Sequence, residues 1–195
     1  LQRTYTWLDS DFVSTFSVQR QALYGELGVP LNGLWKLSIG ARLEQHEADY
    51  ADNAGVSFTP YDDLFGGRIR LERSYQSGAL AYASFTQGYK SGGFNTSGTL
   101  DADLRLFDPE TLWNFEVGYK ATVFNDAGQL RVALFHMARS DVQIATSIVR
   151  VRDDGSSEFI EFTGNAASGA NQGVEVELDL ALSERASMSA GLGLL

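Results

Sequence analysis

The chain has 195 residues, and its 44% hydrophobic and 12% aromatic content excludes an intrinsically disordered protein. Its formal net charge of -10 argues against nucleic acid as a partner, because binding phosphates requires a concentrated basic face. The sequence contains neither cysteine nor an apolar run of about 18 residues, so it offers no disulfide framework and no candidate transmembrane helix.

The first strands alternate between apolar and polar residues. Residues 19–29 predict a strand, and Asn32-Gly33 predicts a two-residue turn with positive φ at both central positions. Successive side chains of a strand point to opposite sides, so residues 34–46 have one apolar and one polar face. The apolar face carries Trp35, Leu37, Ile39, Ala41 and Leu43. Residues 47–66 are rich in Asp, Asn, Gly and Pro and predict a long loop.

The alternation then resumes and continues to the end of the chain. Residues 67–75 and 79–90 predict two strands joined by a tight turn, and residues 91–110 predict a second long loop. The clearest pattern is in residues 111–124, and a tight turn separates it from a strand at 129–150. Residues 158–182 form another strand after a hairpin tip, and a further strand begins at Ala186.

These patterns predict an all-β fold with about eight long antiparallel strands and connections that alternate between short and long. A soluble sandwich or lipocalin-like barrel would show the same period of two. Soluble strands average 5–6 residues, however, whereas about 9–11 tilted residues cross a bilayer, and several of the predicted strands are longer than that. Charges of both signs on the polar faces also suit a wide, wet lumen. We therefore predict a segment of a transmembrane β-barrel.

Three segments resemble the TonB-dependent receptors, the siderophore and nutrient importers of the Gram-negative outer membrane. They are LAYASFTQGYKSGGFN at 80–95, FDPETLWNFEVGYK at 107–120, and GNAA at 164–167 followed by QGVEVEL at 172–178. The resemblance begins near residue 22. It implies a 22-stranded barrel around an N-terminal plug domain, with residues 1–195 being part of the barrel and the plug lying outside them.

The resemblance also implies a function. We expect an outer-membrane active transporter for a ferric siderophore or a similar scarce nutrient, embedded in the lipid bilayer and energised by the TonB–ExbB–ExbD complex through the plug. It implies no enzyme activity and no cofactor. Two alternatives stay open: a passive outer-membrane pore or anchor of the same architecture, and a soluble ligand-binding β domain.

Candidate site residues lie in the loops and at the strand ends. Aromatic and cationic loop residues can stack on and pair with an aromatic, anionic iron chelate, although the same rings could simply pack the loops together. The ligand-binding candidates are Tyr50, Tyr61, Phe94, Arg105 and Phe107. Rings at strand ends suit the headgroup level of a membrane. The membrane-interface candidates are Trp35, Trp113, Tyr119 and Phe124.

The sequence lacks the motifs of the common catalytic sites. It has no GxSxG, HExxH, P-loop or cysteine nucleophile, so no catalytic residue is predicted. The acidic cluster of Glu44, His46, Glu47, Asp49 and Asp52 could hold a divalent cation, but solvated strand-end charge is favoured and no metal site is predicted. His136 is expected to be packed or interfacial.

Overall fold

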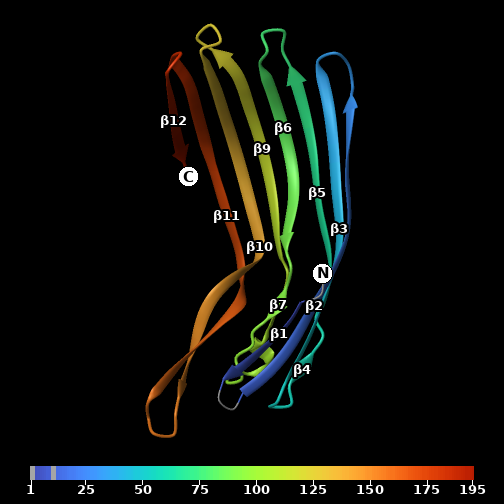
Figure 1. The fold of residues 1–195 in the computed structure, drawn as a ribbon, viewed down its shortest axis with the longest axis vertical. Helices are drawn as coiled ribbons and strands as arrows, with labels where there is room; N and C mark the ends of the chain where they lie inside the picture. Colours follow the sequence, from blue (N-terminus) through green and yellow to red (C-terminus); the bar gives the residue numbers. More distant parts are fainter. Residues whose placement is uncertain (1–2, 10–11) are drawn as a thin grey trace.

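The computed structural model describes residues 3–9 and 12–195, with side chains from residue 12 onward, and contains one large antiparallel sheet (Figure 1). Eight long strands form it: β2 (Phe12–Pro30), β3 (Trp35–Asp52), β5 (Tyr61–Ser74), β6 (Leu80–Lys90), β9 (Glu110–Val123), β10 (Gly128–Val151), β11 (Ser157–Ser183) and β12 (Ala186–Leu194). Each is paired antiparallel with the next, and in the described part β12 is paired on one side only.

Shorter elements complete the fold. β1 (Arg3–Asp9) pairs with β2, and β4 (Ser57–Phe58) pairs with β3. Between β6 and β9, β7 (Gly93–Phe94) pairs with β8 (Leu106–Phe107), and the 3-10 helix η1 (Ala102–Leu104) lies between them in the chain. No helix in the described ranges is long and apolar enough to cross a membrane.

The predicted fold is confirmed, but three local predictions are wrong. The first predicted strand starts at residue 19, but β2 already begins at Phe12 and is preceded by β1. The start of β2 is a strand because it pairs with β1. The predicted loop at 47–66 is mostly strand, because β3 runs to Asp52 and β5 starts at Tyr61. Neither Asn32 nor Gly33 has a positive φ. The Asn32 side chain instead accepts hydrogen bonds from the Leu34 and Trp35 amides, which closes the turn without left-handed backbone.

The connections at the two ends of the sheet differ in length. At the top of Figure 1 the links β2–β3, β5–β6, β9–β10 and β11–β12 are tight turns. At the bottom lie the β3–β5 connection with β4, the segment with β7, η1 and β8, and the far end of the β10–β11 hairpin. We call these the short-turn end and the loop end. Outer-membrane barrels have short periplasmic turns and longer external loops, so this asymmetry is the one that such a barrel shows.

One side of the sheet, here named the apolar face, carries large apolar side chains in register from strand to strand. On β3 it displays Trp35, Leu37, Ile39, Ala41 and Leu43, with the polar residues between them on the other side. Across the sheet, Leu27, Ile39 and Ile69 are partners in one row, and Leu23, Leu43 and Phe65 in another. On β9 to β12 the same face displays Trp113, Phe115, Val117, Tyr119, Leu134, Val174, Val176, Leu178 and Leu192.

The apolar face ends abruptly toward the loop end. The positions next to Leu23, Leu43 and Phe65 on the same face are Gln21, Gln45 and Asp63, which are again partners in register. On β11 the corresponding change is from Val174 to Gln172. Five apolar positions on β3 span about nine residues, which is the length that a tilted strand needs to cross hydrocarbon. The apolar face is therefore a band of bilayer height.

The band is exposed. Ile39 is 45% exposed, Phe65 48% and Phe115 51%, and no second layer covers them in the part of the chain that the structure describes. A soluble protein rarely exposes a contiguous apolar surface of this extent. The exposed rows therefore favour lipid as their solvent over the interior of a soluble β domain.

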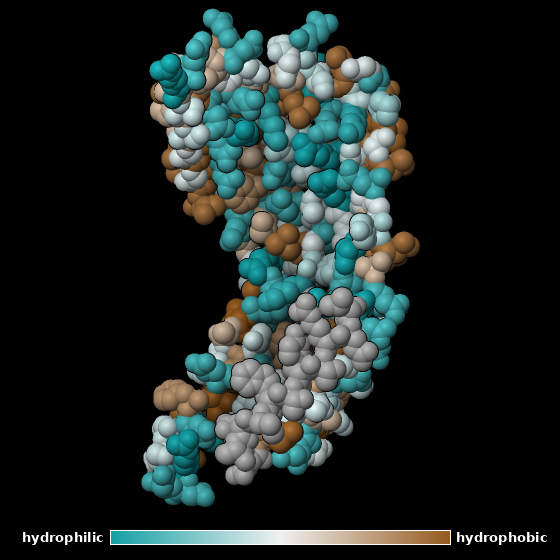
Figure 2. Space-filling model, in the orientation of Figure 1, coloured by the Kyte–Doolittle hydropathy of each residue, from teal (hydrophilic) through white to brown (hydrophobic). Residues whose placement is uncertain are grey.

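The opposite side, here named the polar face, carries charged side chains in pairs. Figure 2 shows hydrophilic residues over the middle of its upper half and hydrophobic residues at the side edges. Ion pairs on this side include Arg68–Glu26, Arg42–Glu44, Arg70–Glu72, Arg139–Glu110 and Arg131 with both Glu177 and Asp179. These pairs, some within one strand and some between strands, neutralise part of the charge on a side that only water or a polar partner can cover.

One contact on the polar face depends on a glycine. The ring of Tyr82 lies flat over Gly118, its partner on β9, and its hydroxyl donates to Glu116 at 2.8 Å. The Arg70 guanidinium lies over the same ring, 4.2 Å from its centre. A Cβ at position 118 would overlap the ring, so no other residue allows this arrangement.

We therefore expect Gly118→Ala to destabilise the full-length protein by about 1–3 kcal/mol, the usual cost of an added methyl group in a packed site. Urea unfolding in vesicles measures the change. Gly25→Ala is the matched control, because a Cβ there meets nothing within 4 Å. Equal losses in the two variants would show that the cost comes from the backbone and not from the Tyr82 ring.

Candidate functional site

A hollow of about 940 Å³ lies on the polar face, where the strands approach the loop end. β2, β3, β5 and β6 supply most of its lining, and Gln143 and Thr163 on β10 and β11 close the far side. Glycines at Gly40, Gly66 and Gly67 line part of it without side chains. The hollow is therefore wide and open, and its lining combines charged and polar side chains with apolar surface.

Four cations surround this space, which we name the cationic hollow. They are Arg20, Arg42, Arg68 and Lys90. Arg68 pairs with Glu26 at 2.5 Å and Arg42 pairs with Glu44. Arg20 and Lys90 have no ion pair among the described residues, although Arg20 donates to the Ser91 hydroxyl at 3.4 Å. Glu44 is the one carboxylate in the lining, so the hollow is positive in a chain that is strongly negative overall.

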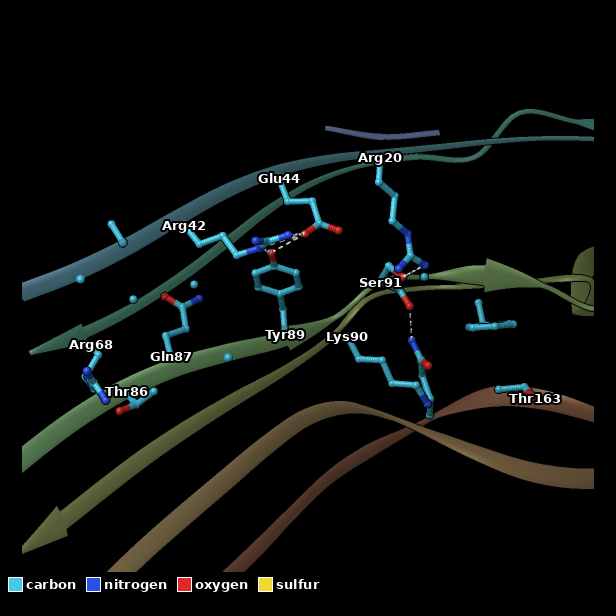
Figure 3. Close-up of a pocket in the computed structure, with 18 residues that line it drawn as sticks. Arg20, Arg42, Glu44, Arg68, Thr86, Gln87, Tyr89, Lys90, Ser91 and Thr163 are labelled. Atoms are coloured by element: carbon cyan, nitrogen blue, oxygen red, sulfur yellow. Dashed lines mark hydrogen bonds and ion pairs between the residues drawn. The ribbon is translucent and has the colours of Figure 1, made fainter. Parts of the chain in front are cut away.

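Tyr89 connects β6 to β3 across the hollow. Figure 3 shows its ring directed from β6 toward Arg42 and Glu44 on β3. Its hydroxyl donates to Glu44 at 2.9 Å and accepts from Arg42 Nε at 2.9 Å. Strict alternation along β6 from Phe85 would place Tyr89 on the apolar face. The two hydrogen bonds show that Tyr89 departs from this alternation and that its phenol ring points into the hollow.

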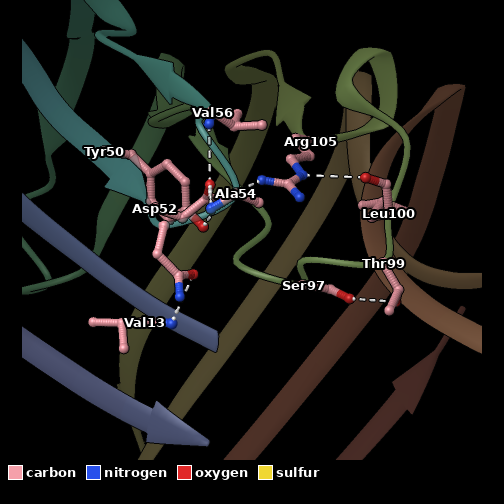
Figure 4. A network of polar contacts seen from close by, with 10 residues as sticks. Val13, Tyr50, Asp52, Ala54, Val56, Ser97, Thr99, Leu100 and Arg105 are labelled. Carbon is pink, nitrogen blue, oxygen red and sulfur yellow. Dashed lines mark hydrogen bonds and ion pairs between the residues drawn. The ribbon is translucent and has the colours of Figure 1, made fainter. Parts of the chain in front are cut away.

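The loop end beyond the hollow is held by a buried ion pair (Figure 4). Arg105 Nη1 lies 2.7 Å from Asp52 Oδ2, and the two side chains are 3% and 0% exposed. Arg105 Nε also donates to the Leu100 carbonyl, and Asp52 accepts from Tyr50 and from the Ala54 and Val56 amides. Burial alone would raise the pKa of Asp52, but these donors, Arg105 foremost, hold that pKa below its ordinary value.

Aromatic rings pack beside this ion pair. Tyr50 stacks on Phe58 with ring centres 4.5 Å apart, and Phe94 contacts both of them at 5.3 Å. Phe94 also meets Phe16 at 5.5 Å, so the cluster joins β2, β3, β4 and β7. Asn95 next to it donates to the Thr163 carbonyl and accepts from the Thr163 amide. The loops are thereby fastened to the sheet rather than spread into solvent.

The predicted ligand-binding residues occupy three different places. Tyr50, Phe94 and Arg105 are packed into the loop end, and Tyr50 and Arg105 are each 2% exposed. Tyr61 points away from the hollow with its hydroxyl on Asp63, on the side of the apolar face. Phe107 alone lines the cationic hollow. Ligand contact by these five residues stays a prediction.

The sequence reasoning missed Arg20, Arg42, Lys90 and Tyr89. The sequence could have predicted the grouping of the arginines, because alternation places Arg20, Arg42 and Arg68 on the polar side of neighbouring strands. No comparable signal existed for Tyr89, whose direction depends on its partners on β3.

The predicted interface aromatics lie at both edges of the band or beyond it. Trp35 is at the short-turn edge and Trp113 at the loop-end edge, and both point from the apolar face. Tyr119 shares a register row with Trp35 through Arg73 and Ala81. Phe124 is in the β9–β10 turn, with φ 55° and 65% of its surface exposed. Contact of these rings with lipid headgroups stays a prediction.

The acidic cluster predicted at 44–52 divides between the two faces. Glu44, His46 and Asp52 are on the polar side and pair with Arg42, Asp62 and Arg105, whereas Glu47 and Asp49 are on the other side. In the part of the chain with described side chains, no group of three His, Cys, Asp or Glu residues could hold a metal ion. His136 lies on the apolar side between Phe115 and Gln172, beside the edge of the band.

Comparison with known families agrees with this geometry over almost the whole chain. Residues 2–194 match the family model described as TonB dependent receptor-like, beta-barrel. The chain belongs to this family. The match also extends the resemblance, which the sequence motifs place from about residue 22 onward, to β1 and the first half of β2. The family consists of receptors and transporters rather than enzymes.

Solved structures with the same fold are larger receptors. The ferric yersiniabactin uptake receptor FyuA from Yersinia pestis has a TM-score of 0.75 and 19% identity, covering 94% of this chain and 27% of its own. The siderophore receptor PiuA from Acinetobacter baumannii has a TM-score of 0.67 and 19% identity, covering 93% and 25%. The copper transporter OprC has a TM-score of 0.64 and 16% identity, covering 97% and 36%. The chain thus spans about a quarter to a third of their length.

Proposed function

We propose that the chain is part of a Gram-negative outer-membrane transporter that takes up an anionic iron chelate of the ferric siderophore class. In this proposal the apolar face meets lipid and the polar face meets the lumen of a closed barrel, of the 22-stranded type, completed by other strands of the full-length protein. A plug domain of that protein passes on the energy supplied by the TonB–ExbB–ExbD complex.

The observation that carries the proposal is the position of the cationic hollow. It lies on the polar side of the strands whose other side forms the apolar band, and toward the loop end, which would face the exterior. Arg20 and Lys90 form no ion pair among the described residues, although they lie near Glu44 and Glu110, respectively. Cations without an ion pair can bind the oxygen atoms of an anionic chelate. Tyr89 and Phe107 add aromatic surface on which the chelate can stack.

The decisive experiment uses the full-length protein in a deletion strain and measures uptake of radioactive iron from ferric hydroxamate and ferric catecholate complexes. We expect uptake of at least one complex, and its loss when TonB is deleted. Uptake that continues without TonB, together with steady conductance in a planar bilayer, would instead identify a passive pore.

The hollow itself is tested by the double variant Arg20→Gln with Lys90→Gln. Each charge-assisted hydrogen bond contributes about 1.5–3 kcal/mol, so the dissociation constant of the transported complex should rise tenfold or more. Arg131→Gln is the control, because Arg131 lies on the polar face near the short-turn end and is already paired with Glu177 and Asp179. Unchanged affinity in the double variant would remove the hollow from the binding site.

A further inference from the structure

One arginine projects from the apolar face at the short-turn edge of the band. Arg73 is the register partner of Trp35 and is solvent-exposed, whereas its neighbour Glu72 points to the polar face and pairs with Arg70. No carboxylate with a described side chain lies within ion-pair distance of Arg73. A guanidinium group at the rim of a hydrocarbon band therefore has no negative partner within the described protein.

Two aromatic rings hold this guanidinium in position. Its central carbon lies 5.4 Å from the centre of the Trp35 ring and 4.9 Å from the centre of the Tyr75 ring. The next residue of the same row, Ala81, is small, and Arg73 is exposed. Cation–π contacts orient a guanidinium without neutralising its charge, so the N–H groups stay available for an acceptor.

The opposite edge of the band has different chemistry. Gln21, Gln45 and Asp63 occupy the corresponding positions at the loop end, where the Gln45 amide donates to Asp63 at 3.3 Å. On β2, β3 and β5 that edge presents amides and a carboxylate, whereas the short-turn edge presents a cation between two rings. The two leaflets of the bilayer would therefore meet different groups on this sheet.

We propose that Trp35, Arg73 and Tyr75 form a binding site for the phosphodiester headgroup of an anionic glycerophospholipid. Charge complementarity identifies the ligand, because the planar fork of an arginine matches two phosphate oxygens. The rings lie at the depth where amphipathic aromatic side chains meet headgroups. The site faces the leaflet at the short-turn end, and the inference rests on the membrane placement in the proposed function.

The test is native mass spectrometry of the full-length protein titrated with phosphatidylglycerol, and separately with phosphatidylethanolamine. We expect phosphatidylglycerol to bind more tightly, and Arg73→Gln to weaken its binding about fivefold, the contribution of one cation beside an anionic lipid surface. Arg73→Lys should bind with an affinity between those of the wild type and Arg73→Gln, because it keeps the charge but not the planar fork. Arg70→Gln is the matched control, since Arg70 also lies over a ring but faces the other side.

Equal binding of the two lipids by the wild-type protein would overturn the proposal, and this result needs no variant. Equal losses in Arg73→Gln and Arg70→Gln would overturn it as well. A failure of membrane placement is a separate result, because the protein would then not insert into vesicles of either lipid.

Discussion

Replacing Ile39 by arginine is expected to destabilise the full-length protein in vesicles by about 2–4 kcal/mol. Ile39 is the middle one of the five apolar positions on β3, and its register partners Leu27 and Ile69 lie on the same face. A cation on the lipid side of a barrel costs most at the bilayer midplane, where neither water nor headgroups solvate it. Urea titration followed by tryptophan emission measures the loss.

Gln45→Arg tests the same face of the same strand beyond the edge of the band. Gln45 lies among Gln21 and Asp63, so an arginine there can reach headgroups or water and should cost about 0–1 kcal/mol. Both substitutions add one cation to the same face of β3, so the difference in their stability costs depends only on depth in the bilayer. Equal costs for Ile39→Arg and Gln45→Arg would contradict the assignment of the band to lipid.

The second large effect is expected from Arg105→Met, which leaves the buried Asp52 carboxylate without its cation. Removing one partner of a buried ion pair costs about 3–5 kcal/mol. The Ala54 and Val56 amides donate to Asp52, so their protection reports on the opening of this network. We expect hydrogen exchange at these amides in the full-length protein to accelerate at least about a hundredfold, while amides of the band strands keep their protection.

Two controls separate the buried pair from charge loss in general. Arg150→Met removes an exposed cation whose partner Asp101 is 63% exposed, and such surface pairs contribute at most about 1 kcal/mol. The double variant Arg105→Met with Asp52→Leu should recover part of the stability, because no unpaired charge is then buried. Unchanged exchange in Arg105→Met would show that the loops are held by the aromatic cluster alone.

The sequence predicts the strands well where one face is continuously apolar. A period of two over residues 34–43 and 111–123 follows directly from the contrast between hydrocarbon and water, so it can be read without knowledge of the partners. The pattern fails at the loop end. Residues 47–52 look like a loop in composition, yet they are strand, because Tyr50 packs on Phe58 and Phe94 and Asp52 receives Arg105.

The candidate site was predicted less well for a related reason. Tyr50 and Arg105 have the composition of ligand-binding residues, but partners from distant segments bury them. Tyr89 is on the polar face only because Arg42 and Glu44 bind its hydroxyl. Such contacts join residues about 45 positions apart, and no local pattern encodes them.

The sequence by itself determined the all-β architecture, the two-faced strands and the likeness to TonB-dependent receptors. These properties depend on side-chain alternation and on local motifs, and both can be read along the chain. Only the tertiary structure decided which charges remain unpaired in the cationic hollow, which loop residues are buried, and where Arg73 meets its two rings. Each of these depends on register between strands, which brings together residues that the sequence keeps apart.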